Sequence, residues 1–156
     1  MNKKETYRQL VQQVEGLVAE ESDLIANLAN TAAAVYHKLA RVNWAGFYLW
    51  REGELVLGPF QGQPACIRIE KGNGVCGTAV EEKKTLVVPD VHQFPGHIAC
   101  DPASQSEIVV PIIVEGTVKG VLDIDSPEKN RFTEADRKFL EEIVEILIAA
   151  SDWTVL

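Results

Sequence analysis

The chain has 156 residues, 46% hydrophobic and 24% charged, a composition typical of one globular domain rather than a disordered segment. Its 23 acidic and 15 basic residues give a net charge of −8, which argues against nucleic acid, because phosphate binding needs clustered Lys and Arg. No apolar run approaches the roughly 18 residues of a membrane span, and polar residues follow the N-terminus where a signal peptide would be apolar. We therefore expect a cytoplasmic protein without a membrane partner.

Two amphipathic helices are expected at the start of the chain. Apolar residues recur at helical spacing from about residue 3 to 20, and again from about residue 23 to 39, where Ser22 or Asp23 supplies an N-cap. The segments after them are typical of strands, and those with this pattern are 42–50, 55–58, 66–69, 85–88, 107–113 and 117–125. The turn at Glu115-Gly116 predicts that the last two form a hairpin.

Two further features interrupt the strands, and a helix follows them. The segment Gly72-Asn73-Gly74 breaks the chain before a short helix over 75–80, and residues 89–104 form a loop long enough to suggest a functional role. The last helix opens at Thr133, with Asp136 at the position where a capping box usually has Glu or Gln. This order predicts an α+β domain with N- and C-terminal helices packed on a central antiparallel sheet.

The first candidate site is a group of carboxylates. Asp123 and Asp125 are two positions apart on a strand, so they project from one face while Leu122 and Ile124 point to the other. Two like charges so placed repel each other unless a cation or solvent separates them. Glu107 opens the preceding strand and can reach the same region. A bound ammonium group would suit this cluster, whereas the plainer interpretation is a solvated strand end.

Aromatic residues on the strand at 42–50 form a second candidate. Trp44 and Tyr48 share one face, and Phe47 and Leu49 share the other. One face should belong to the core. The other is either further core or an aromatic wall that suits a methyl or thioether group.

Three cysteines carry the third candidate chemistry, and in a reducing compartment an odd number is not a structural disulfide framework. Cys76 follows glycines near a predicted helix N-terminus, where backbone N–H groups favour the thiolate. Cys66 begins a strand and fits a small core residue equally well. Cys100 lies in the long loop, where Asp101 opposes thiolate formation and a protonated His97 favours it.

Other site chemistries are not expected. The spacing of His92, His97 and Cys100 lacks a partnering Cys-x2-Cys pair, so we predict no metal. The segment Gly72-Asn73-Gly74 is not followed by the Lys-Ser pattern of a phosphate loop. A Ser-His-Asp hydrolase would need a nucleophile elbow, which the sequence lacks.

Several of these residues lie in segments that closely resemble the free methionine-(R)-sulfoxide reductases, a family of stand-alone GAF domains. The segments are 43–49 (NWAGFYL), 58–62 (GPFQG), 66–67 (CI), 72–77 (GNGVCG), 89–92 (PDVH), 99–101 (ACD), 106–111 (SEIVVP) and 122–126 (LDIDS). The spacing of the three cysteines is the most specific part of the pattern. The resemblance implies one GAF domain over residues 1–156, with helices in 1–40, the sheet and active-site loops in 42–125, and a C-terminal helix in 133–150.

The resemblance also implies a mechanism. Cys100 attacks the sulfur of free methionine (R)-sulfoxide, Glu107 or an aspartate protonates the departing oxygen, and a sulfenic acid remains on Cys100. Either Cys66 or Cys76 then forms a disulfide with Cys100, which thioredoxin, fed by NADPH, reduces without any bound cofactor.

The same resemblance implies how the substrate binds. Trp44 and Tyr48 wall the methyl end, while Glu107, Asp123 and Asp125 hold the α-ammonium. The main alternative is a GAF module that senses a small ligand without turnover, and a second is a structural dimerisation domain. We expect a homodimer, the commonest assembly, with amphipathic terminal helices available to pack across a two-fold axis.

Overall fold

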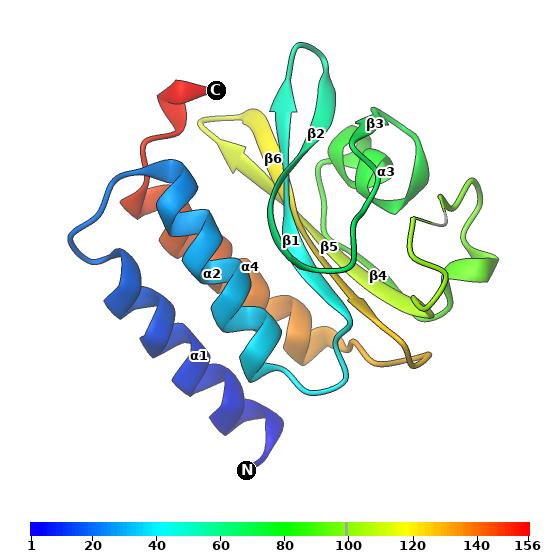
Figure 1. The fold of residues 1–156 in the computed structure, drawn as a ribbon, viewed down its shortest axis with the longest axis horizontal. Coiled ribbons are helices and arrows are strands. Elements are labelled where there is room, and N and C mark those ends of the chain that lie inside the picture. The colour runs from blue at the N-terminus through cyan, green and yellow to red at the C-terminus, as the bar shows by residue number, and fades with distance from the viewer. Residues whose placement is uncertain (99) are drawn as a thin grey trace.

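The computed structural model describes residues 1–98 and 100–156 and contains a six-stranded sheet with helices on both faces (Figure 1). The helices are α1 (Lys3–Val18), α2 (Leu24–Lys38), α3 (Gly74–Glu82) and α4 (Glu134–Ala150), with short 3-10 helices η1 (Val91–Gln93) and η2 (Trp153–Val155). The strands are β1 (Trp44–Arg51), β2 (Glu54–Gly62), β3 (Arg68–Glu70), β4 (Leu86–Val88), β5 (Ser106–Val114) and β6 (Thr117–Ser126).

The sheet has the order β3-β2-β1-β6-β5-β4, and every pair is antiparallel, which confirms the predicted fold class. Strand β2 runs further than the predicted 55–58, because its pairing with β1 resumes after a register shift between Gly46 and Tyr48. A Cβ atom at Gly46 would clash with the Phe60 side chain, so only glycine allows this close approach. The shift carries Phe60 to the same face as Trp44, with their rings stacked at 5.2 Å.

The two faces of the sheet are covered differently. Helices α1, α2 and α4 cover one face, where they form the larger apolar core with Phe47, Leu49, Leu122 and Ile124 (Figure 1). Helix α3 lies on the other face, where a second apolar cluster includes Trp44, Tyr48 and Cys76. The face of β1 that carries Trp44 and Tyr48 is therefore packed as well, and the same two residues line a small cavity.

Asp136 ties the N-terminal helix to α4. Its side chain is fully buried, and it accepts hydrogen bonds from Tyr7 Oη at 2.6 Å and Lys3 Nζ at 2.6 Å. The Thr133 backbone N–H donates to the same carboxylate at 2.8 Å, so the predicted capping residue is correct, and Arg131 Nη1 donates at 3.2 Å. Burial opposes ionisation, but the hydrogen bonds from Lys3 and Tyr7 lower the pKa of Asp136.

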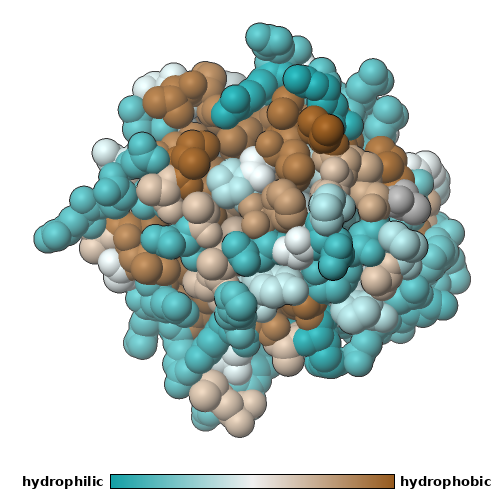
Figure 2. Space-filling view, viewed as in Figure 1, coloured by the Kyte–Doolittle hydropathy of each residue, from teal (hydrophilic) through white to brown (hydrophobic). Residues whose placement is uncertain are grey.

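Figure 2 shows how polar and apolar residues are distributed over one face of the molecule. Hydrophilic residues cover most of the face in Figure 2, and hydrophobic residues gather over its upper part. Within residues 1–98 and 100–156, no helix is both long and apolar enough to cross a membrane.

Candidate active site

Three carboxylates come together on the face of the sheet that α3 covers. The alternation along β6 sends Leu122 and Ile124 into the core and turns Asp123 and Asp125 the other way. Strand β5 pairs antiparallel with β6, and Glu107 lies opposite Asp125. All three carboxylates line one small cavity, as the sequence pattern predicts.

Burial makes these carboxylates difficult to ionise. Glu107 and Asp123 are only 7% and 6% exposed. Burial first, and then the neighbouring Asp123 carboxylate, raises the pKa of Glu107 well above its usual range. Burial and the charge of Asp125 raise the pKa of Asp123 in the same way, and burial and Glu107 raise that of Asp125. The cluster therefore retains protons at pH values where an exposed carboxylate has lost them.

Cys76 lies beneath this cluster, in the first turn of α3. Its Sγ atom is buried 4.0 Å from Glu107 Oε2. Burial, followed by the charges of Asp123 and Glu107, raises the pKa of the Cys76 thiol. The prediction that a helix N-terminus makes this thiol acidic is therefore wrong, because desolvation and nearby carboxylates outweigh the partial charge of a nine-residue helix.

Cys66 and Cys100 form a disulfide that joins the segment after β2 to the 89–104 loop. Their Cα atoms are 5.5 Å apart, and 34 positions separate them in sequence. Among the described residues, Cys76 is the free cysteine. In this state Cys100 has no thiolate to donate to a metal. The ring centroids of His92 and His97 are 6.5 Å apart, and burial, with His92 nearby, lowers the pKa of His97, so the predicted assistance from a protonated His97 is not supported.

The predicted aromatic wall lies against the same cavity. Trp44 and Tyr48 are both 2% exposed and stack at 5.9 Å. The Tyr48 hydroxyl donates to the Cys66 carbonyl at 3.0 Å, and Trp44 Nε1 donates to the Gln63 carbonyl at 3.0 Å. These bonds hold the segment carrying Cys66 against β1.

Several cavity residues were missed by sequence reasoning. Asp101 and Ser104 line the cavity beside Cys100, and Asn43 holds both, with Nδ2 donating to Asp101 Oδ2 at 3.0 Å and to Ser104 Oγ at 3.2 Å. Asp101 was considered only as a charge beside Cys100, and Asn43 and Ser104 had no signal beyond their position within or next to the segments that carry the family resemblance. Polar loop residues are common, and their partner lies about sixty positions away along the chain.

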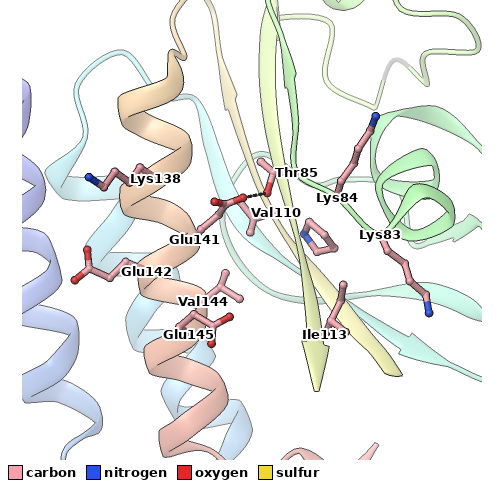
Figure 3. A pocket seen from close by; sticks show the side chains of 11 residues that line it. Lys83, Lys84, Thr85, Val110, Ile113, Lys138, Glu141, Glu142, Val144 and Glu145 are labelled. Carbon is pink, nitrogen blue, oxygen red and sulfur yellow. Dashed lines mark hydrogen bonds between the residues drawn. The ribbon is translucent and has the colours of Figure 1, made fainter. Parts of the chain in front are cut away.

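The cavity has a volume of only about 40 Å³ with the disulfide formed. A groove of about 510 Å³ lies elsewhere, between α4 and strand β5 (Figure 3). In that groove Thr85 Oγ1 donates to Glu141 Oε2 at 2.6 Å, and Lys83 and Lys84 point away from α4. It lacks the cysteines and the carboxylate cluster, so the smaller cavity is the candidate active site.

The sheet order, the helices that cover both faces and the small cavity under the 89–104 loop are those of a GAF domain. The family model for the GAF domain matches residues 23–150.

The relatives define the family more narrowly. Free methionine-R-sulfoxide reductase of Escherichia coli (strain K12) is 50% identical over 156 residues, covering 98% of this chain and 94% of that protein. The Saccharomyces cerevisiae protein of the same name is 44% identical, covering 94% and 86%. The X-ray structure of free methionine-R-sulfoxide reductase from Neisseria meningitidis in complex with its substrate has a TM-score of 0.93 at 47% identity, covering 96% and 90%. The chain belongs to the family of GAF-domain free methionine-R-sulfoxide reductases.

Proposed function

We propose that this protein reduces free L-methionine (R)-S-oxide to L-methionine through its cysteines. The observation that carries this proposal is the Cys66–Cys100 disulfide beside a cavity lined by Glu107, Asp123 and Asp125. The names of the Escherichia coli and Saccharomyces cerevisiae relatives support it. We take the whole of residues 1–156 as one GAF domain.

Cys100 is the attacking thiol in this proposal. Its thiolate attacks the sulfoxide sulfur, the sulfoxide oxygen is protonated and transferred, and methionine leaves a sulfenic acid on Cys100. The Cys66 thiol then attacks that sulfur and releases water, giving the disulfide. Two thiols thus supply the two electrons that the sulfoxide gains. Cys66 is favoured over Cys76 as the resolving thiol, because Cys66 is disulfide-bonded to Cys100 and Cys76 is buried among carboxylates.

The carboxylate cluster has two tasks. A carboxyl whose pKa is raised by burial, Glu107 or one of the aspartates, keeps a proton to deliver to the departing oxygen. The ionised members bind the α-ammonium of the free amino acid. Trp44 and Tyr48 contact the methyl end. A methionine inside a peptide carries no ammonium and would leave buried carboxylates unpaired, which selects for the free amino acid.

Substrate entry requires reduction of the disulfide. A cavity of about 40 Å³ is far smaller than typical small-molecule pockets, which hold about 300 Å³ or more. Because the disulfide ties the 89–104 loop to the segment after β2, we propose that thioredoxin opens this bond and frees the loop. Thiol–disulfide exchange with thioredoxin returns both cysteines to thiols, and NADPH supplies the electrons. Such a cycle suits the cytoplasm, where thiols are kept reduced.

The test is NADPH consumption with thioredoxin and thioredoxin reductase, comparing free (R)- and (S)-methionine sulfoxide. We expect turnover with the (R) isomer alone. Replacing Cys100 with Ser should abolish turnover, Cys66→Ser should leave a single turnover that stops at the sulfenic acid, and Cys76→Ser serves as the matched variant that keeps the disulfide pair. If the fully reduced protein bound a ligand tightly but turned over neither isomer, its function would be that of a ligand-sensing GAF module and not of a reductase.

The assembly state is a separate proposal. We propose a homodimer, the commonest symmetric assembly. Light scattering on the purified chain should give twice the monomer mass of 17.2 kDa.

A further inference from the structure

We propose that Cys76, Glu107 and Asp123 also form a binding site for one thiophilic divalent cation, with Zn²⁺ as the best match. The three side chains come from α3, β5 and β6, and all are buried. One ligand atom from each, the Cys76 sulfur and a carboxylate oxygen of Glu107 and of Asp123, lies within 4.8 Å of the others. The proposed reaction uses none of these groups as a metal ligand, so this is an additional property of the site.

A second observation points to a missing partner in the cluster. Asp123 is 6% exposed, and its Oδ1 atom is buried without a hydrogen-bond partner in the described part of the chain. A buried acceptor without a hydrogen-bond partner destabilises the folded chain. By contrast, the fully buried carboxylate of Asp136 contacts two cationic side chains and a hydroxyl. A cation bound by Asp123 would supply the partner that this oxygen lacks.

The distance between the Cys76 and Glu107 ligand atoms is close to that in a zinc site, and the other ligand atoms lie within 4.8 Å of each other. Zinc binds thiolate sulfur at about 2.3 Å and carboxylate oxygen at about 2.1 Å, which places tetrahedral sulfur and oxygen ligands about 3.6 Å apart. Cys76 Sγ and Glu107 Oε2 are 4.0 Å apart. A shift of a few tenths of an ångström in one side chain would complete that edge of the tetrahedron. The mixture of one sulfur and two oxygen ligands favours Zn²⁺, Cd²⁺ or Co²⁺ over Mg²⁺ and Ca²⁺, which prefer oxygen ligands alone.

The cavity supplies the remaining coordination position. Glu107 and Asp123 both line it, and its volume of about 40 Å³ exceeds the roughly 10–15 Å³ that one water needs. An ion with a bound water, or with Asp125 as its fourth ligand, therefore fits a space that is too small for an amino acid. The cation would use the carboxylates assigned to the substrate ammonium, so it would inhibit by competition. That consequence rests on the proposed function, whereas binding of the cation does not.

The experiment uses the oxidised protein, in which the Cys66–Cys100 disulfide leaves Cys76 as the only thiol. Titration with Co²⁺ should produce a thiolate-to-cobalt charge-transfer band that saturates at one ion per chain, and Zn²⁺ should remove it. Cys76→Ser should abolish the band. Asp123→Asn should weaken Co²⁺ binding by about tenfold or more while the band still forms at saturation.

Two control variants separate this site from other metal ligands. The double variant Cys66→Ser/Cys100→Ser should keep the band, because it retains Cys76 alone. His97→Ala should keep it too, which excludes binding by the His92 and His97 pair. A band that survives in Cys76→Ser, or wild-type protein that gives no band at millimolar Co²⁺, would overturn the proposal.

Competition between the substrate and the cation connects the two proposals, and separate outcomes show which of the two has failed. Free methionine (R)-sulfoxide added to the reduced Cys66→Ser/Cys100→Ser protein should displace Co²⁺. A protein that binds Co²⁺ through Cys76 yet reduces no sulfoxide would retain the cation site and lose the proposed function. A protein that reduces the sulfoxide but shows no Cys76-dependent band would retain the proposed function and lose the cation site.

Discussion

Two groups of buried carboxylates in this molecule have opposite surroundings. Asp136, between α1 and α4, contacts Lys3, Arg131 and Tyr7, and although burial opposes ionisation, the hydrogen bonds from Lys3 and Tyr7 lower its pKa. Glu107 and Asp123, on the other face of the sheet, lie among other carboxylates and Cys76, and burial together with the neighbouring carboxylates raises their pKa values. A buried carboxylate that the chain pairs with its own cations holds the fold together. A buried carboxylate that has no cationic side chain beside it indicates a binding site for a cationic ligand.

The largest effect expected from this difference is the loss of reductase activity when a carboxylate of the cavity is replaced. Asp123→Asn removes one ionisable partner of the substrate ammonium and should lower kcat/KM for free methionine (R)-sulfoxide by about 10²–10⁴-fold. The free energy of unfolding at neutral pH should not fall, because a neutral amide replaces an unpaired buried acid. The thioredoxin-coupled assay and urea unfolding measure the two quantities. A variant that lost stability and kept activity would reverse the roles that we assign to these carboxylates.

The same substitution at Asp136 should lower stability and leave substrate binding unchanged. Asp136→Asn leaves the buried Arg131 guanidinium without its carboxylate and should lower the free energy of unfolding by about 3–5 kcal/mol. KM for the sulfoxide should stay within about twofold, since α1 and α4 lie on the far face of the sheet. Adding Arg131→Met to the variant should restore part of the stability. No recovery in the double variant would show that the ion pair is not the source of the loss.

The pH dependence of stability should separate the two groups more finely. Unfolded Asp and Glu titrate near about 4, so with raised native pKa values the native pocket binds more protons than the unfolded chain above that pH. The pocket therefore costs stability increasingly as pH rises from about 4 towards the raised values. Asp136, with a lowered pKa, contributes stability above about pH 4 and loses it as pH falls through its native value.

Unfolding measured from pH 5 to 8 checks this sign. The stability advantage of Asp123→Asn over the wild type should grow with pH, by at most about 1.4 kcal/mol per pH unit for one group. The stability deficit of Asp136→Asn relative to the wild type should stay constant over this range, because Asp136 is ionised in both the folded and the unfolded chain above about pH 5. A constant difference between wild type and Asp123→Asn would mean that Asp123 is ionised in the folded protein.

The sequence was sufficient wherever local periodicity decides the structure. The alternation along β6 correctly separated Asp123 and Asp125 from the core, and the spacing along β1 correctly paired Trp44 with Tyr48. The starts of α2 and α4 were also predictable, because Asp23 and Thr133 cap these helices through hydrogen bonds to residues three positions on.

Long-range contacts were beyond the sequence. Lys3 reaches Asp136 across 133 positions, and the capping pattern gave no sign that the cap is also a buried ion pair. Cys76 looked acidic from its helix, yet its thiol faces carboxylates contributed by β5 and β6. Phe60 joined the aromatic wall only through an irregular register between β1 and β2. Each of these depends on what lies opposite in space, which local spacing does not encode.

The most direct test of the unpaired-carboxylate account compares free (R)-methionine sulfoxide with its N-acetyl form in the thioredoxin-coupled assay. Acetylation removes the ammonium and leaves the sulfoxide unchanged. If Glu107, Asp123 and Asp125 await that cation, kcat/KM should fall by about a thousandfold or more. Values for the two compounds within about tenfold of each other would contradict the account, since the buried acids would then have some other purpose.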